Sequence, residues 1–362
     1  MAVLLTGLTR AIISPDDEIF YENRPAEKLY APSAESYMDK SFQDSVENVL
    51  SDQVNAAIKM KKLYNIIDTS LALPAVKELH NSADTYIAFR DIYFYKDVLV
   101  KKPVPFGEKR AALDATIKSL NQYFAASEET DFFVYYIETD RDIDFDTNQK
   151  SGFYEHISST LALPSDHISK LSIDCFEDYS KNFLHTDHHW NGIGAYNAYL
   201  SICKMLGSEA LESKDLYSSD GGYLGTRAAG VEGIEPESFS VNIFDFPTMD
   251  ITINDNPAED YGMQSQFISN QMTEFSYGSV FGPDCREIIF DTGNTGNNLL
   301  VMGDSYDNAI VKALATGFSK TYCIDLRAYG ANGFDLIKYV DEHDIDSVLF
   351  IGAIEYFSSI LY

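Results

Sequence analysis

The sequence predicts an α/β fold in which helices cover a largely parallel sheet. In the last third of the chain, compact apolar runs at 298–302, 321–325 and 347–353 predict buried strands, and a helical pattern covers 334–342. Strands that alternate with helices in this way form parallel sheets with both faces covered. The run 132–138 is equally apolar and is bounded by charge, which predicts one more buried strand.

The rest of the chain gives weaker patterns. Apolar residues spaced by three and four predict helices over 41–64, 107–126 and 191–206. Aromatic and β-branched residues over 84–100 predict short strands. The stretch 216–290 is rich in Gly, Asp, Asn and Ser, so we expect an irregular insertion with short strands between the two halves of the core.

Two polar stretches resemble ligand-binding loops, and their spacing argues against that function. Residues 291–298 are glycine-rich but lack the Lys-Ser/Thr pair of a phosphate loop, so they predict a hairpin turn. The acidic residues of 140–146 lack the spacing of an EF-hand, so they predict a solvated charged loop.

Composition excludes some classes of protein. The chain has 362 residues and a net charge of −29, from 27 basic and 56 acidic residues. A chain this acidic repels phosphate backbones, which argues against nucleic acid as a partner. Its four cysteines form no CxxC pair, which excludes a zinc ribbon or a thioredoxin motif and leaves two disulfides or four free thiols open.

The amino terminus allows two interpretations. The apolar start MAVLLTGL is too short to span a membrane. It is either the remnant of a longer membrane anchor or a buried first strand or frayed end. Residues 1–40 are predicted to be an extended arm, and 41–362 the main domain.

The first segment with catalytic potential is LLVMGDSYDNAI, residues 299–310. A buried strand ends in Gly303-Asp304-Ser305, and a helix is predicted to follow from about Tyr306. Ligand sites in α/β sheets lie at such strand ends, and backbone N–H groups there can stabilise an oxyanion. Gly303 is expected to permit the tight turn. The alternative is that Asp304 or Ser305 only caps the helix.

The second segment is HTDHHWNGIGAY, residues 185–196. Asp187 and His189 are one residue apart, so a carboxylate could orient an imidazole that acts as a base. His185, Asp187, His188 and His189 could instead bind a metal, since neutral imidazole is a common ligand. A polar loop before a helix is the third alternative. Together, the two segments supply a nucleophile, a base and a group that orients the base.

TDHHWNGIGAYNAY (186–199) resembles the signature of the DHHW family of bacterial envelope proteins, which is similar to the alginate O-acetyltransferases. Three other segments also resemble that family. They are residues 18–53, which match its amino-terminal segment, and LLVMGDSYDNAI (299–310) and YCIDLRAYG (322–330), which match its carboxyl-terminal motifs. The resemblance implies a three-layer SGNH-hydrolase-like fold. Because the Asp/His block precedes the Ser block, the reverse of ordinary SGNH hydrolases, it also implies a circularly permuted order.

The resemblance also implies roles for single residues. Ser305 matches the nucleophile, His189 the general base and Asp187 its partner, while His188 occupies a variable position between them. The late Gly-x-Asn-Asp block of SGNH hydrolases is not evident in this chain. The candidates for oxyanion or substrate contacts are Gly303, Tyr306, Asn308, Arg327 and Trp190.

The function that these features predict is serine-dependent acyl transfer. The acceptor is expected to be a cell-envelope or extracellular polysaccharide, through O-acetylation or, with water as acceptor, esterase activity. The resemblance implies a membrane-bound O-acyltransferase as donor partner and an extracytoplasmic location, and the mechanism is expected to need no metal or organic cofactor. The alternative functions are a non-catalytic carbohydrate-binding or scaffold subunit of a membrane acetylation machine, and a metal-dependent hydrolase.

Overall fold

The computed structural model describes residues 92–362 except 128, 229–233, 273, 330–332 and 360–362, and before them 18–19, 24–25, 28, 33, 36–37, 40–53, 63, 75 and 85–89. The chain divides into two compact units. Unit 1 is Met1–Leu99 with Leu224–Glu235, and unit 2 is Val100–Tyr223 with Pro236–Tyr362. The apolar start lies outside the described residues, and the predicted domain boundary at residue 40 stays a prediction.

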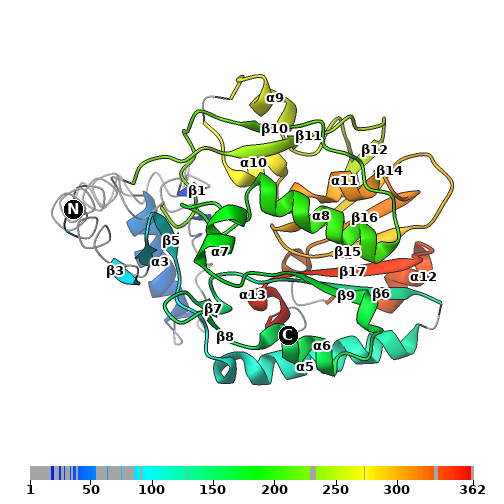
Figure 1. Cartoon of the computed structure of the whole chain (residues 1–362), viewed down its shortest axis with the longest axis horizontal. Helices are drawn as coiled ribbons and strands as arrows, with labels where there is room; N and C mark the ends of the chain where they lie inside the picture. The colour runs from blue at the N-terminus through cyan, green and yellow to red at the C-terminus, as the bar shows by residue number, and fades with distance from the viewer. Residues whose placement is uncertain are drawn as a thin grey trace. The chain divides into compact units, whose positions relative to one another are not determined.

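Unit 2 contains an eight-stranded sheet in the order β13-β12-β14-β16-β15-β17-β6-β9 (Figure 1). The five strands from β16 to β9 pair in parallel. They are β16 (Lys320–Ile324), β15 (Leu299–Met302), β17 (Ser347–Gly352), β6 (Asp131–Ile137) and β9 (Ile168–Leu171). The three predicted carboxyl-terminal strands are therefore neighbours, as the sequence indicates, and every residue of β15 and β17 is buried.

The other edge of the sheet is antiparallel. It consists of β12 (Asp250–Ile253), β13 (Asn256–Ala258) and β14 (Glu287–Asp291), with β14 paired to β16. The stretch 216–290 therefore supplies three strands of the main sheet and is not simply an insertion. The predicted hairpin at 291–298 is wrong, because β14 and β15 both pair with β16 and the connection between them crosses from one side of it to the other.

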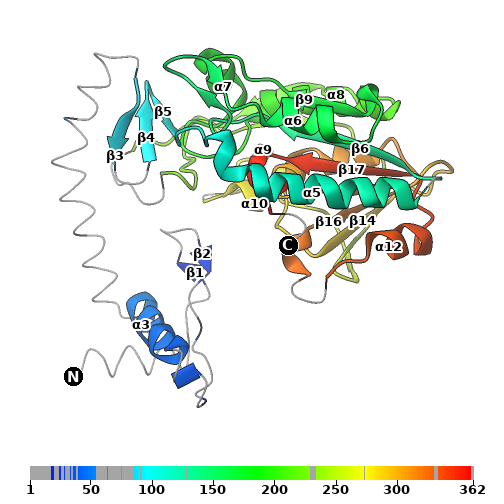
Figure 2. The same cartoon turned by 90° about the horizontal axis from the view of Figure 1, so that it is seen from below.

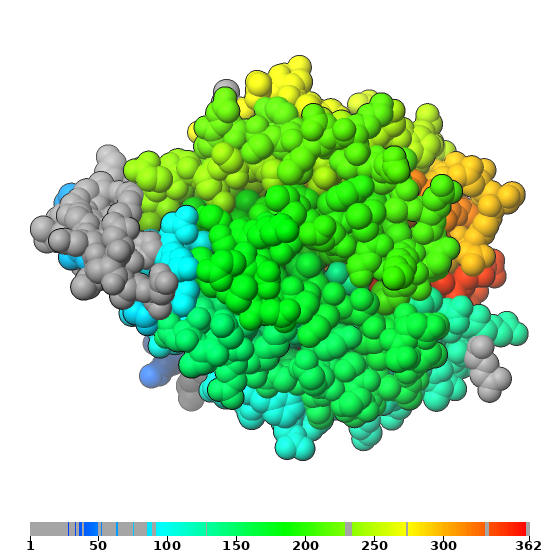
Figure 3. Space-filling model, in the orientation of Figure 1, coloured from blue at the N-terminus to red at the C-terminus, as the bar shows by residue number. Residues whose placement is uncertain are grey.

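Helices cover both faces of the sheet, which gives three layers (Figures 1 and 2). On one face, α5 (Phe106–Ala126), α6 (Phe153–Thr160), α12 (Leu336–Glu342) and α13 (Ile354–Phe357) contribute side chains to one buried core with β6, β15, β16 and β17. On the other face, α8 (Gly192–Leu206) contacts β6 and β9, and α11 (Val311–Ala315) contacts β14 and β16. In the space-filling view, much of the face shown comes from the green middle of the chain (Figure 3).

Unit 2 also contains several shorter elements. They are β7 (Ile143–Asp144), β8 (Gln149–Lys150), η2 (Ser165–His167), α7 (Phe176–Asn182), β10 (Asp215–Ser218), β11 (Ser240–Ile243), α9 (Gln264–Ile268), α10 (Tyr277–Phe281), η3 (Asp307–Ala309) and η4 (Leu326–Ala328). All four cysteines lie in described parts of the chain and are free thiols. Among the described helices, none is both long enough and apolar enough to cross a membrane.

Unit 1 holds the described amino-terminal elements. These are β1 (Glu18–Ile19), β2 (Arg24–Pro25), α3 (Ser41–Gln53), β3 (Ile87–Phe89), β4 (Ile92–Tyr95) and β5 (Val98–Val100). The strands predicted within 84–100 are present and form one small sheet. The helix predicted from residue 41 is described as far as Gln53; most of 54–64 lies outside the described residues.

The predicted solvated loop at 140–146 is wrong. Asp140 and Asp142 are buried, with 0% and 4% of their surface exposed. Asp142 accepts hydrogen bonds from the Tyr136 hydroxyl at 2.6 Å and from the Thr139 N–H at 2.8 Å. Burial raises the pKa of Asp142 to about 7, so this carboxyl titrates near neutrality.

Candidate active site

Ser305 and His189 meet at the carboxyl end of β15. Ser305 follows β15 by a two-residue turn, and its Oγ lies 2.8 Å from His189 Nε2. His189 Nδ1 lies 3.0 Å from Asp187 Oδ1. The contact predicted between the two motifs is therefore present, although 116 residues separate its partners. This geometry suits an imidazole that donates from Nδ1 to the carboxylate and accepts the serine proton at Nε2.

Asp187 is wholly buried and is held by donors on both oxygens. Its Oδ1 accepts from the His188 N–H at 2.6 Å, and its Oδ2 accepts from the Tyr223 hydroxyl. Burial by itself would raise the pKa of Asp187. The positive charge available at His189 and the hydrogen bonds of His188 and His189 outweigh burial and hold that pKa well below its usual value. The group is therefore an anion at neutral pH.

The loop that carries Asp187 and His189 is fixed at both ends. On its amino-terminal side, Glu237 accepts the N–H groups of His185 and Thr186 at 2.8 and 2.6 Å. On its carboxyl-terminal side, the Asn191 side chain caps α8 by accepting the N–H groups of Ile193 and Gly194. The predicted helix start at Asn191 is confirmed, and the loop has little freedom to move the imidazole.

His188 is closer to the site than its position between the two motif residues suggests. Its Nδ1 lies 2.9 Å from the same Asp187 oxygen that His189 contacts, and its side chain is 40% exposed. Asp187, His188 and His189 thus present three ligand-type atoms within 4.8 Å of one another. His185 is not part of this group, and its Nε2 contacts Ser180 Oγ at 3.0 Å. The four-residue metal set considered from the sequence is therefore not assembled.

The turn after β15 differs from the prediction in two ways. The helix expected from Tyr306 is the one-turn η3, and α11 begins only at Val311, so a long helix dipole does not point at Ser305. Gly303 is needed because of close packing and not because of its backbone angles. A Cβ there would lie 2.2 Å from Asp307 Oδ2 and 2.9 Å from Ile351 Cγ2.

Most of the candidate oxyanion and substrate residues have partners inside the protein. Tyr306 donates its hydroxyl to His188 O at 2.6 Å, and Trp190 is buried with its Nε1 donating to Tyr277. Asn308 donates to Gly282 O and Asp284, and Arg327 is paired with Asp325 and Asp284. These bonds engage the four side chains within the protein, and their contacts with oxyanion or substrate stay a prediction. The oxyanion candidate at the turn is the Ser305 N–H, since the Tyr306 N–H donates to Asp304.

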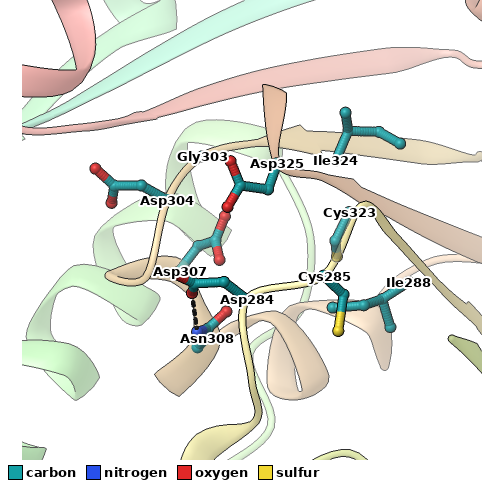
Figure 4. A pocket seen from close by; sticks show the side chains of 10 residues that line it. All are labelled: Asp284, Cys285, Ile288, Gly303, Asp304, Asp307, Asn308, Cys323, Ile324 and Asp325. Carbon is teal, nitrogen blue, oxygen red and sulfur yellow. Dashed lines mark hydrogen bonds between the residues drawn. The ribbon is translucent and has the colours of Figure 1, made fainter. Parts of the chain in front are cut away.

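An acidic pocket adjoins the turn (Figure 4). Its lining includes Asp284, Asp304, Asp307 and Asp325 together with Cys285 and Cys323. Burial, and then the charges of Asp304, Asp325 and Asp284, raise the pKa of Asp307 well above its usual value. Burial also raises the pKa of Asp304 to about 6. The surroundings of Asp304 and Asp307 therefore favour the protonated form of both carboxyls relative to a carboxyl in water.

Tyr223 and Tyr277 are site residues that the sequence reasoning missed. Tyr223 donates to Asp187, and the Tyr277 ring stacks on the His189 imidazole at a centroid distance of 3.9 Å and an interplanar angle of 10°. Both come from the stretch that was predicted to be irregular. Its weak periodicity gave no sign of either contact.

Comparison with known proteins agrees with this fold. The family model described as DHHW protein matches residues 127–324. A DHHW family protein from Eubacterium siraeum has a TM-score of 0.55 at 18% identity, over 76% of this chain and 94% of that chain. Bacillus cereus PatB1 with a sulfonyl adduct has a TM-score of 0.55 at 20% identity, over 76% of this chain and 98% of that chain. No curated protein matches the sequence.

The O-acetyltransferase domain of Pseudomonas putida AlgJ also aligns, over 77% of this chain and 94% of that chain, but its TM-score is 0.36 at 10% identity. A likeness this distant says nothing about the chemistry of this chain. The family model, in contrast, covers more than half of the sequence and includes Asp187, His189 and Ser305. The chain belongs to the DHHW protein family.

Proposed function

We propose that this protein is a serine-dependent acyltransferase that acetylates or deacetylates hydroxyl groups of a cell-envelope or extracellular polysaccharide. The observation that carries the proposal is the hydrogen-bonded series from Asp187 through His189 to Ser305. A serine hydroxyl is a weak nucleophile on its own and needs an adjacent base whose orientation is fixed. The polysaccharide acceptor rests on the family resemblance.

The mechanism follows from the order of these groups. His189 Nε2 takes the proton of Ser305 as Oγ attacks the acyl carbonyl, and the anionic Asp187 stabilises the imidazolium. The Ser305 N–H is the proposed donor to the developing oxyanion. The imidazolium then protonates the leaving group, and an acyl-serine remains. A sugar hydroxyl, deprotonated by His189, then attacks the acyl-serine; the acyl–Oγ bond breaks, and the imidazolium returns the proton to Ser305 Oγ. Water in place of the sugar gives esterase activity.

The proposal extends to the kind of fold and the location. We propose that the three-layer domain is a circularly permuted SGNH-like domain, in which the Asp/His block precedes the Ser block. It is proposed to work outside the cytoplasmic membrane and to be supplied with acyl groups by a membrane-bound O-acyltransferase. Fractionation of cells that express the native gene tests the location, and a cytosolic protein would contradict it.

The catalytic proposal is tested with p-nitrophenyl acetate and with a sulfonyl fluoride. Replacing Ser305 with alanine should lower the esterase rate by about 10³-fold or more, equal to about 4 kcal/mol of transition-state stabilisation. His189→Ala should cost a similar amount and the double variant little more, because the two residues act as a unit. The sulfonyl group should add to the wild type and not to Ser305→Ala, as read by intact mass.

Two outcomes would favour the alternative functions. Equal rates for the wild type and Ser305→Ala, with glycan binding intact in both, would indicate a scaffold subunit. A rate abolished by a chelator would indicate a metal-dependent hydrolase at Asp187, His188 and His189.

A further inference from the structure

We propose that Tyr277 is a positioning residue for the acyl-transfer site: it fixes the plane of the His189 ring and stabilises the imidazolium. This inference rests on the proposed function and adds a residue to it. The two rings are nearly parallel, with an interplanar angle of 10° and a centroid distance of 3.9 Å. A cation over the face of an aromatic ring is attracted by the ring's negative face.

Tyr277 also joins the two catalytic segments. Its hydroxyl accepts from Trp190 Nε1 at 3.0 Å and donates to Tyr306 O at 3.5 Å. Trp190 directly follows the base, and Tyr306 directly follows the nucleophile. One side chain therefore contacts the base and also bonds to the chain on either side of the Ser305–His189 contact.

The Tyr277 ring is held firmly enough for this role. It is 4% exposed, and it opens α10 directly after Ser276, whose side chain and that of Ser279 form a capping box. Its pKa is raised well above the ordinary value, mainly by burial, so the phenol stays neutral and its hydroxyl keeps a proton to donate. Among the described residues, the polar and titratable groups around the stacked pair are Asp187, His188, Tyr223, Asp304, Ser305, Tyr306 and Asp307.

The test compares two variants that separate the ring from its hydroxyl. Tyr277→Phe keeps the stack and loses the bonds to Trp190 and Tyr306, so kcat/KM should fall less than about fivefold, with an unchanged acid limb in its pH profile. Tyr277→Leu loses the ring stack as well as these hydrogen bonds, so kcat/KM should fall about tenfold or more. Its acid limb should move to lower pH, because an imidazolium without the ring loses its proton more readily.

Phe267→Leu is the matched control for lost packing. Phe267 is 3% exposed and packs against the aromatic rings of Tyr217, Phe239 and Phe275; none of these ring contacts is with His189 or Tyr277. The Phe267→Leu variant should lose about as much stability as Tyr277→Leu, but its pH profile should stay that of the wild type. An acid limb that does not move in Tyr277→Leu, or that moves equally in Phe267→Leu, would overturn the proposal.

A second measurement keeps this inference separate from the proposed function. The His189 ring can be followed by NMR during a pH titration on the inactive Ser305→Ala background, with His189→Gln to assign its signal. Tyr277→Leu should still displace that titration to lower pH, whether or not the wild type cleaves esters. A wild type without Ser305-dependent activity would sink the enzyme proposal alone; a titration unchanged by Tyr277→Leu would sink this inference alone.

Discussion

Asp187 shows how single residues in this site replace water with protein donors. The carboxylate is wholly buried, and a buried carboxylate stays charged only where hydrogen bonds and opposite charge compensate for the lost water. His188 and His189 supply these on one oxygen, and Tyr223 supplies a donor on the other. Removing one donor weakens this compensation at a carboxylate with no exposed surface.

Replacing Tyr223 with phenylalanine tests this compensation. The ring would keep its contacts with Phe239 and Phe275, but Asp187 Oδ2 would lose the hydrogen bond from the Tyr223 hydroxyl. The free energy of unfolding at pH 7 should fall by about 1.5–3 kcal/mol, the range for hydrogen bonds to charged groups. Urea denaturation measures this loss.

Tyr217→Phe is the control for a lost tyrosine hydroxyl. The Tyr217 hydroxyl donates to Asn270 Oδ1 in an exposed setting, where water can take its place. Its loss should change stability by less than about 0.5 kcal/mol. Equal losses in the two variants would mean that the charge on Asp187 does not depend on Tyr223.

The sequence predicted the three central residues because each lies in a local pattern. Asp187 and His189 are separated by one residue, and Ser305 closely follows an apolar strand. Tyr223 and Tyr277 have no such pattern, since they reach Asp187 and Trp190 from 36 and 87 residues away and are two of 24 tyrosines. Their roles depend on how distant segments pack, which periodicity does not report.

At the scale of elements, the strand β15 and the turn after it set the position of Ser305. β15 is held by parallel pairing on both sides, and the turn is packed against Ile351 of β17 and against Asp307 at Gly303. A residue with a side chain at 303 would push the turn away from the sheet. The glycine thus sets the position of the Ser305 hydroxyl relative to the His189 imidazole.

Gly303→Ala should therefore harm both stability and activity. The added Cβ meets buried atoms, and overpacking of this kind costs about 1–3 kcal/mol. A displacement of Ser305 by about 1 Å should lower kcat about 10²-fold. Gly278→Ala is the control, because a Cβ at that helical position meets nothing within 4 Å. If Gly303→Ala matched Gly278→Ala in unfolding and ester cleavage, close packing at the turn would not position Ser305.

Element predictions succeeded where they needed only local information. The apolar runs correctly predicted the strands β6, β15, β16 and β17, because strands buried on both faces are continuously apolar. The connection at 291–298 was wrong because turn-forming residues say that the chain bends but not which strand follows as a neighbour. Here β16 lies between the strands on either side of the bend.

At the scale of the whole molecule, the net charge of −29 coexists with carboxyls that folding has buried. Asp142 and Asp304 have pKa values raised by burial to about 7 and about 6, and that of Asp307 is raised well above its usual range. Asp140 and Asp142, which were predicted to lie in a solvated loop, are thus among the acidic residues that the fold keeps from water. Composition gives the sum of the charges and not their depth.

These buried carboxyls predict that the protein is more stable at pH 5 than at pH 8. A carboxyl with a raised pKa in the folded state binds its proton more tightly there than in the unfolded chain, so its contribution is lost as pH rises from about 4 through the folded pKa. For Asp142 that loss extends to about pH 7. The depressed pKa of Asp187 acts oppositely, but its contribution is lost only below about pH 4, outside this window.

Asp142→Asn isolates one of these buried carboxyls. Asparagine cannot ionise, yet its carbonyl can still accept from Tyr136 or Thr139, so the change in Tm between pH 5 and pH 8 should shrink and the variant should match or exceed the wild type at pH 8. The exposed Asp166→Asn controls for one lost negative charge.

Added salt screens repulsion among surface charges but not the desolvation of a buried carboxyl, so the difference between the two variants should persist at about 0.5 M NaCl. A wild-type Tm that rises from pH 5 to pH 8, or an Asp142→Asn slope equal to that of Asp166→Asn, would show that Asp142 is not the group that takes up a proton on folding.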